Sequence, residues 1–209
     1  MKTRTTLATA LALTTALVLA GCSSDDSPGT QTGSEQPTTT TQTPNGNTDA
    51  DLLAAHDLTG LDARQIIERL DTMPLSERPA DLMASIRPDE LILSDAEDNS
   101  LSLPMPSDEF YLSFAPYVDQ THDCYFHSLT TCTGELQKAE ISVTITDSNS
   151  GQIIVDESML TYDNGFAGVW LPRDIEAELT VSYDGLTASA PISTRQADDL
   201  TCLTTLQLT

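Results

Sequence analysis

The residues best suited to chemistry in this sequence lie in one short stretch, HDCYFHSLTTC, which runs from His122 to Cys132. The stretch holds two of the chain's four cysteines and two of its three histidines. Cysteine sulfur and histidine nitrogen form a soft donor set, which favours Cu(I) or Zn(II) over the oxygen-preferring ions Mg(II) and Ca(II). In an oxidising compartment the same cysteines could instead close as a disulfide. The stretch therefore predicts either a soft-metal site or a disulfide-closed loop.

The spacing of Cys124 and Cys132 limits how this stretch can fold. A single helix would separate the two residues by about 12 Å along its axis, and a single strand would separate them by roughly 26 Å. Neither arrangement brings both sulfurs to one metal or into one disulfide. The segment must therefore fold back, as a loop or as a helical turn that reverses. On a helical turn, His127 would face the same way as Cys124.

A third cysteine, Cys202, lies in LTCLTTLQLT near the C-terminus, where it shares one face of an expected last strand with Leu206 and Leu208. If Cys124 and Cys132 form a disulfide, Cys202 remains as a small buried hydrophobe. If the site binds metal, two or three thiolates suffice for Cu(I), and three thiolates with one imidazole would suit zinc. The spacing alone leaves both alternatives open.

The elements that must position these residues begin with a small α+β region, residues 51–106. A helix is expected after Asp62 as its cap, with apolar residues at helical spacing in QIIERL. A second short helix is expected in MPLSERPADLMASI, with Ser76 as its cap. Two short strands should follow in DELILSD and SLSLPMP. This helical region could also pair two copies of the chain as a homodimer.

The period changes to two in residues 107–209. Apolar and polar side chains alternate in AEISVTITD and IEAELTVSY, with turn signals such as SNSG and DG between the strands. Short alternating strands with regular turns predict an antiparallel β-sandwich of immunoglobulin-like type. The whole chain is therefore expected to be an α+β protein, with the last strand able to lie beside the cysteine–histidine loop.

The N-terminus predicts export. Residues 1–21 combine a basic start with the uncharged stretch LATALALTTALVLA, which indicates a signal peptide. LAGC ends at Cys22 and resembles a bacterial lipobox, so we expect a lipid on this thiol and an anchor at the outer face of a bacterial membrane, in the cell envelope or periplasm. Residues 22–50 hold no large apolar side chain and are expected to form a flexible, lipid-anchored stalk.

Charge and motifs exclude several classes of function. The chain has 32 acidic residues against 9 lysines and arginines, a net charge of −23, which argues against nucleic acid and against docking on anionic lipid. Membrane contact is therefore expected through the lipid alone. The sequence contains no Gly-rich phosphate loop and no nucleophile elbow, which argues against a nucleotide-binding enzyme and against a serine hydrolase.

Three stretches occur in the order FYLSFAPYVDQTHDCYFHSLTTCTGEL, TYDNGFAGVWLPRDIEAELTVSYDG and DDLTCLTTLQL. Together they resemble the CueP family of periplasmic copper-binding proteins. The resemblance implies copper binding outside the cytoplasm, in copper tolerance or delivery. It places cysteine ligands at Cys124, Cys132 and Cys202. It also implies a nearby histidine, for which His127 lies inside the motif and His122 lies outside the cysteine pair.

We therefore expect a lipoprotein, a binding protein rather than an enzyme, that sequesters Cu(I) or delivers it to a recipient cuproprotein, with zinc as an alternative ion. A thiol-redox or cupric-reductase protein is a second hypothesis, because a dithiol that binds Cu(I) can also reduce Cu(II) and close to a disulfide. A third is an interaction module in which a disulfide between Cys124 and Cys132 staples the loop.

Overall fold

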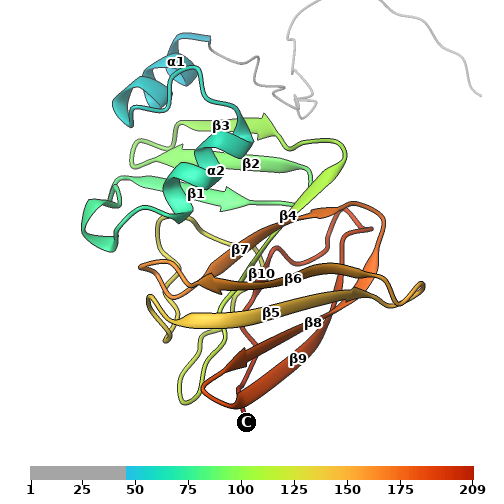
Figure 1. Ribbon diagram of the computed structural model, residues 1–209. Coiled ribbons are helices and arrows are strands. Elements are labelled where there is room, and N and C mark those ends of the chain that lie inside the picture. The colour runs from blue at the N-terminus through green and yellow to red at the C-terminus, as the bar shows by residue number, and fades with distance from the viewer. Residues whose placement is uncertain (1–45) are drawn as a thin grey trace, which may run out of the picture. The chain divides into compact units, whose positions relative to one another are not determined.

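The structure, a computed structural model, describes residues 46–209 (Figure 1). The expected signal peptide, Cys22 and most of the expected stalk lie outside these residues. The described chain is α+β and mostly β. Its helices are α1 (Gly46–Ala55), α2 (Ala63–Asp71) and the 3-10 helix η1 (Leu75–Glu77). Its strands are β1 (Leu82–Ile86), β2 (Glu90–Asp95), β3 (Ser100–Pro104), β4 (Glu109–Phe114), β5 (Glu140–Asp147), β6 (Ile153–Leu160), β7 (Ala167–Pro172), β8 (Glu176–Tyr183), β9 (Leu186–Ser193) and β10 (Cys202–Leu203).

Helix α2 begins where the sequence predicts. The Asp62 side chain accepts a hydrogen bond from the Gln65 backbone N–H at 2.8 Å, and the Gln65 side chain accepts one from the Asp62 N–H at 3.1 Å. This reciprocal pair is a capping box, which satisfies two of the helix's free N–H groups. The helix ends at Asp71, which is fully buried although it is charged. Helix α1 differs from expectation, because residues 46–50 were assigned to the stalk and are helical.

The small N-terminal sheet has the order β1-β2-β3 and is antiparallel. The strands expected in DELILSD and SLSLPMP are confirmed as β2 and β3. The helix expected to start at Ser76 is wrong, since only the turn η1 forms there and β1 follows it. LMASI buries every second residue (Leu82, Ala84 and Ile86), which is the period of a strand. Helix α2 packs over this sheet, and together they enclose one apolar core (Figure 1).

The larger part consists of two sheets on a second apolar core. One has the order β6-β5-β8-β9 and the other β10-β4-β7. The alternation predicted for AEISVTITD and IEAELTVSY is confirmed, because alternate residues of β5 and β8 are buried. All pairs are antiparallel except β10, which runs parallel to β4 and is only two residues long. The immunoglobulin-like type remains a prediction.

Strand β4 lies between the two cores and buries both of its faces. Phe110, Leu112 and Phe114 pack into the core between the larger sheets. Tyr111 points the other way and joins the core beneath α2. Because successive side chains of a strand point to opposite faces, this one strand couples the two parts of the fold.

The β4–β5 connection, residues 115–139, carries the cysteine–histidine stretch. It holds no helix and no strand beyond isolated bridges. The Ile86 N–H donates to the His127 carbonyl at 2.8 Å, and the Leu129 N–H donates to the Ala84 carbonyl at 2.9 Å, which ties the loop to β1. On its other side, the Cys202 N–H donates to the Tyr125 carbonyl at 3.1 Å. The prediction that this segment folds back as a loop is confirmed.

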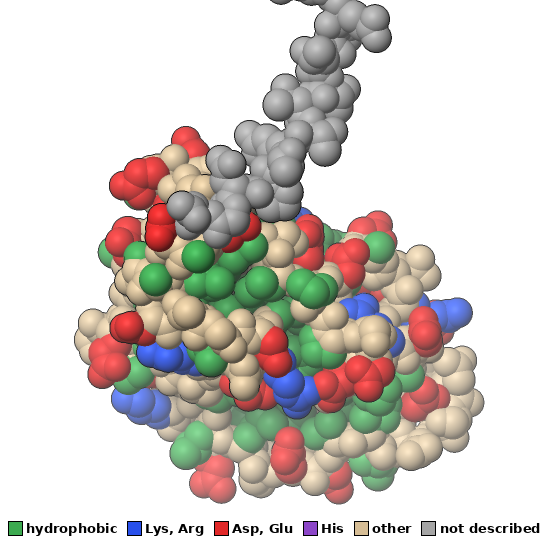
Figure 2. Space-filling model, turned by 90° about the horizontal axis from the view of Figure 1, so that it is seen from above, with side chains coloured by type: hydrophobic (Ala, Val, Ile, Leu, Met, Phe, Trp, Pro, Cys, Tyr) green, Lys and Arg blue, Asp and Glu red, His purple; other side chains and the backbone are tan. Residues whose placement is uncertain are grey.

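Acidic side chains are dispersed over one face of the molecule. On the face seen in Figure 2, Asp and Glu side chains are scattered among polar and hydrophobic ones and do not gather in one patch. A dispersed charge of this kind raises solubility and is not the footprint of one charged partner.

Candidate metal centre

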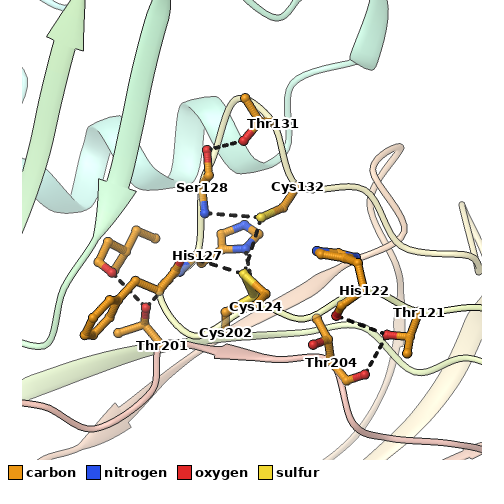
Figure 3. The surroundings of a disulfide bond; sticks show 12 residues. Thr121, His122, Cys124, His127, Ser128, Thr131, Cys132, Thr201, Cys202 and Thr204 are labelled. Atoms are coloured by element: carbon orange, nitrogen blue, oxygen red, sulfur yellow. Dashed lines mark hydrogen bonds between the residues drawn. A yellow bond between two sulfur atoms is a disulfide. The ribbon is translucent and has the colours of Figure 1, made fainter.

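Three cysteines meet beside β10 (Figure 3). Cys124 and Cys202 form a disulfide, with Cα atoms 5.7 Å apart and a sequence separation of 78. Cys132 is the free cysteine of the described chain, and its Sγ lies 3.5 Å from the Sγ of Cys124. The disulfide expected for the interaction module, Cys124–Cys132, is therefore wrong for this structure. The reason is β10, whose hydrogen bond to the Tyr125 carbonyl holds Cys202 against the loop.

A tight turn positions Cys132. Its backbone N–H donates to the Ser128 carbonyl at 3.2 Å, and the Ser128 N–H donates to the Cys132 sulfur at 3.4 Å. The Arg78 guanidinium donates to the Cys132 carbonyl at 2.8 Å. Burial raises the pKa of the Cys132 thiol, but hydrogen bonding and charge from His127 outweigh burial and lower that pKa below its ordinary value. The surroundings therefore favour the thiolate, which is the form that binds metal and attacks disulfides.

His127 lies fully buried behind the sulfurs. Its Nδ1 is 3.7 Å from the Cys202 sulfur, and the donor atoms of His127, Cys132 and Cys202 all lie within 4.8 Å of one another. The Phe166 ring packs against the imidazole at a centroid distance of 4.6 Å. The histidine favoured by the sequence is thus placed with two of the predicted cysteine ligands.

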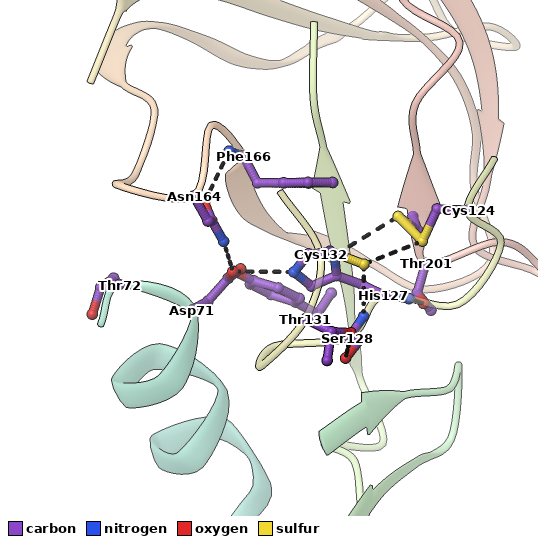
Figure 4. Close-up of polar contacts among 12 residues, drawn as sticks. Asp71, Thr72, Cys124, His127, Ser128, Thr131, Cys132, Asn164, Phe166 and Thr201 are labelled. Atoms are coloured by element: carbon purple, nitrogen blue, oxygen red, sulfur yellow. Dashed lines mark hydrogen bonds and ion pairs between the residues drawn. A yellow bond between two sulfur atoms is a disulfide. The ribbon is translucent and has the colours of Figure 1, made fainter. Parts of the chain in front are cut away.

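Sequence reasoning missed Asp71, which orients His127 (Figure 4). Asp71 Oδ1 lies 3.1 Å from His127 Nε2, and both side chains are 0% exposed. The Tyr111 hydroxyl donates to Asp71 Oδ2 at 2.7 Å, and the Asn164 amide donates to Oδ1 at 3.0 Å. Because the carboxylate accepts the proton of Nε2, Nδ1 is the nitrogen left to face the sulfurs. A carboxylate behind a ligating histidine commonly fixes its tautomer in this way.

The pKa values of this pair follow from its burial and charge. Burial alone would lower the pKa of His127, but the charge of Asp71 and their hydrogen bond raise it to about 9. Burial alone would raise the pKa of Asp71, but His127, Tyr111 and Asn164 lower it. The two shifts agree that Asp71 and His127 form a buried ion pair in the absence of metal.

One signal in the sequence could have revealed Asp71. It follows Ile67 by four residues, so it continues the buried stripe of α2 with a charged side chain. A carboxylate on the apolar face of a helix needs a buried partner. Asn164 gave no such signal, because YDNG has the composition of an ordinary turn.

The structure also brings His122 to the sulfurs. The donor atoms of His122, Cys124 and Cys132 lie within 4.8 Å of one another. His122 is partly buried, and its Nε2 is buried without a hydrogen-bond partner. From the sequence, His127 was expected to be the ligand in preference to His122. The structure places one imidazole in each of two cysteine-containing groups.

The donor set of this centre suits a soft ion. The sulfur atoms belong to the cluster formed by Cys124, Cys132, Cys202, Ala115 and Phe166, and an imidazole nitrogen lies within 4.8 Å of two sulfurs in each of the two groups. Soft thiolates favour Cu(I) and Zn(II). Cys124 and Cys202 can bind a metal as thiolates only after their disulfide is reduced, whereas Cys132 is already free.

A mostly β protein with this buried group of cysteines and histidines has the features of a soft-metal-binding protein. The comparisons define it further. The profile of the family described as "Periplasmic copper-binding protein CueP" matches residues 65–207, and the chain belongs to this family. A solved structure, "Crystal Structure of S.CueP", is similar with a TM-score of 0.71 at 46% identity, over 77% of this chain and 97% of that chain. The curated proteins gave no significant match. No helix among residues 46–209 is long and apolar enough to cross a membrane.

Proposed function

We propose that this protein binds Cu(I) through Cys124, Cys132 and Cys202 together with His127, and that it sequesters or delivers the ion in copper tolerance. The observation that carries the proposal is the convergence of three sulfurs and the Nδ1 of a carboxylate-oriented histidine in one buried cluster. Membership of a copper-binding family supports the choice of copper.

The oxidation state follows from the ligands. Thiolate sulfur stabilises Cu(I), which accepts two or three ligands, so the reduced cysteines suffice and His127 can complete the site. Zinc remains the alternative ion, and a structural zinc site would need all four donors in tetrahedral geometry.

Tethering is part of the proposal. A lipid on Cys22 and the acidic segment after it would hold the copper-binding part near a membrane outside the cytoplasm. A tethered donor can reach a recipient cuproprotein on the same membrane at high effective concentration. Mass spectrometry of the protein purified from membranes should find diacylglycerol on Cys22, and an unmodified thiol there would overturn the tether.

The test of copper binding is an anaerobic Cu(I) titration of the reduced full chain against a competing chromophoric chelator. Wild type should remove Cu(I) from the chelator, whereas Cys132→Ser and Cys202→Ser should weaken binding strongly. His56→Ala is the matched control, because His56 follows α1 outside both candidate ligand groups. Failure of wild type to compete, or equal competition by both serine variants, would overturn the proposal.

A thiol-redox function is the second candidate. It is favoured by the contact of 3.5 Å between the free Cys132 sulfur and the disulfide sulfur of Cys124, together with the lowered pKa of Cys132. Closure of a dithiol to a disulfide releases two electrons and could reduce two Cu(II) ions to Cu(I). Catalytic reduction requires a supply of thiol reductant to reopen the disulfide. Reduction that stops after one round in the presence of such a reductant would contradict an enzymatic role.

A further inference from the structure

We propose that His122, Cys124 and Cys132 form an outer Cu(I) site, from which the ion passes to an inner site formed by His127, Cys132 and Cys202. The inference rests on the proposed function, because it takes Cu(I) as the ion. In this structure the three donor atoms of each group lie within 4.8 Å of one another. After reduction of the Cys124–Cys202 disulfide, both groups offer two thiolates and one imidazole.

The two groups differ in access to solvent. His122 and Cys124 are partly exposed, so the outer group can meet an ion or a donor from outside. His127 is 0% exposed and Cys202 is 1% exposed, so the inner group is closed off from water. An ion that enters from solvent therefore meets the outer group first.

Cys132 belongs to both groups, so the ion can move from the outer site to the inner site without leaving its sulfur. The ion can stay bound to the Cys132 sulfur while it exchanges Cys124 for Cys202 and His122 for His127. The Cys124 and Cys202 sulfurs are close enough to form a disulfide in this structure. Each exchange thus moves the ion between neighbouring donors without releasing it to water.

The imidazole of His122 has a ring nitrogen that is free to bind a ligand. Its Nε2 is buried and has no hydrogen-bond partner within the described chain. A buried polar nitrogen is normally paired, so an unpaired one calls for a partner that the chain itself does not supply. Figure 3 shows the His127 ring beside the cysteine sulfurs and the His122 ring to one side of them.

Phe166 gives the two groups a common wall. Its ring centroid is 4.6 Å from that of His127 and 6.1 Å from that of His122, and the residue is itself fully buried. One apolar ring therefore excludes water behind both imidazoles.

The first test is the rate of Cu(I) uptake by the reduced full chain from a chromophoric Cu(I) chelator, followed by stopped flow. His122→Ala should slow uptake by about tenfold or more, while the equilibrium affinity stays close to that of wild type. His56→Ala should change neither quantity. Uptake by His122→Ala at the wild-type rate would overturn the outer site and leave the proposed function intact. Absence of Cu(I) binding by wild type would overturn both.

The second test does not depend on rate. In ¹⁵N-labelled His127→Ala the inner site lacks its imidazole, so Cu(I) should remain in the outer site and shift the ring nitrogen signals of His122. Circular dichroism checks that the variant is folded. Unchanged His122 signals in Cu(I)-loaded, folded His127→Ala would overturn the proposal.

Discussion

Replacing Asp71 by asparagine should destabilise the metal-free protein by about 3 kcal/mol, because one partner of a buried ion pair is removed while the other stays buried. Asp71 and His127 are both 0% exposed and 3.1 Å apart. Breaking such a pair costs about 3–5 kcal/mol, and asparagine keeps an oxygen that can still accept from Tyr111, which favours the lower end.

The raised pKa of His127 is consistent with this magnitude. The pKa of His127 in the folded protein is about 9 and the ordinary pKa of histidine is 6.5, and this difference corresponds to about 3 kcal/mol. Because the folded pKa is raised, the stabilisation is fully present below pH 6.5 and is lost as the pH rises through about 9. The difference between wild type and Asp71→Asn should therefore be largest near pH 6 and shrink above pH 9.

Two assays follow this prediction in the disulfide-bonded protein. Urea unfolding at pH 6 and above pH 9 gives the free energies of unfolding. Imidazole ¹⁵N spectra give the pKa of His127, which should fall well below 9 in Asp71→Asn because only Cys132 then opposes the effect of burial. Glu176→Gln is the control: it removes an exposed ion pair with Arg195 and should leave the unfolding curve unchanged. A loss below about 1 kcal/mol, or a His127 that still titrates near 9, would refute the reasoning.

Three further predictions concern the sulfurs and the backbone around them. Reduction of the Cys124–Cys202 disulfide, which spans 78 residues, should lower the free energy of unfolding by about 4 kcal/mol. A reductant should not further destabilise Cys202→Ser, and a loss of stability on reduction as large as that of wild type would contradict the pairing. In the disulfide-bonded Cys22→Ser chain, thiolate absorbance should show Cys132 titrating below its ordinary pKa, and His127→Ala should raise the midpoint; an unchanged midpoint would remove His127 as the cause. Gly165→Ala should cost at least about 2 kcal/mol in urea unfolding, because φ is +78° and a Cβ would lie 2.5 Å from the Gly134 carbonyl oxygen. Gly151→Ala, at φ +71° with nothing within 4 Å, should cost only about 1 kcal/mol, and equal losses would show that the close approach to Gly134 does not matter.

Local patterns were sufficient to predict most elements of the fold. The Asp62 cap and the alternation in AEISVTITD are short-range signals, and the structure confirms both. LMASI was included in the helix expected after Ser76, but pairing with β2 makes it a strand. Whether this segment forms a helix or a strand depends on its partner strand and not on its own propensity.

The candidate site could be predicted only where it depends on local spacing. The need for the cysteine–histidine stretch to fold back followed from its spacing alone. The disulfide partner of Cys124 did not, because it depends on β10 lying parallel to β4 in a contact of two residues. Asp71 reaches His127 from a helix 56 residues earlier in the chain, and only tertiary packing brings them together.

The central claim, a sulfur-bound Cu(I) centre, is tested most directly by copper X-ray absorption on the reduced full chain loaded with one equivalent of Cu(I). The claim predicts a shell of two or three sulfurs, with at most one imidazole nitrogen, that loses a sulfur in Cys132→Ser. A shell of nitrogen and oxygen without sulfur, or a spectrum unchanged in Cys132→Ser, would contradict it.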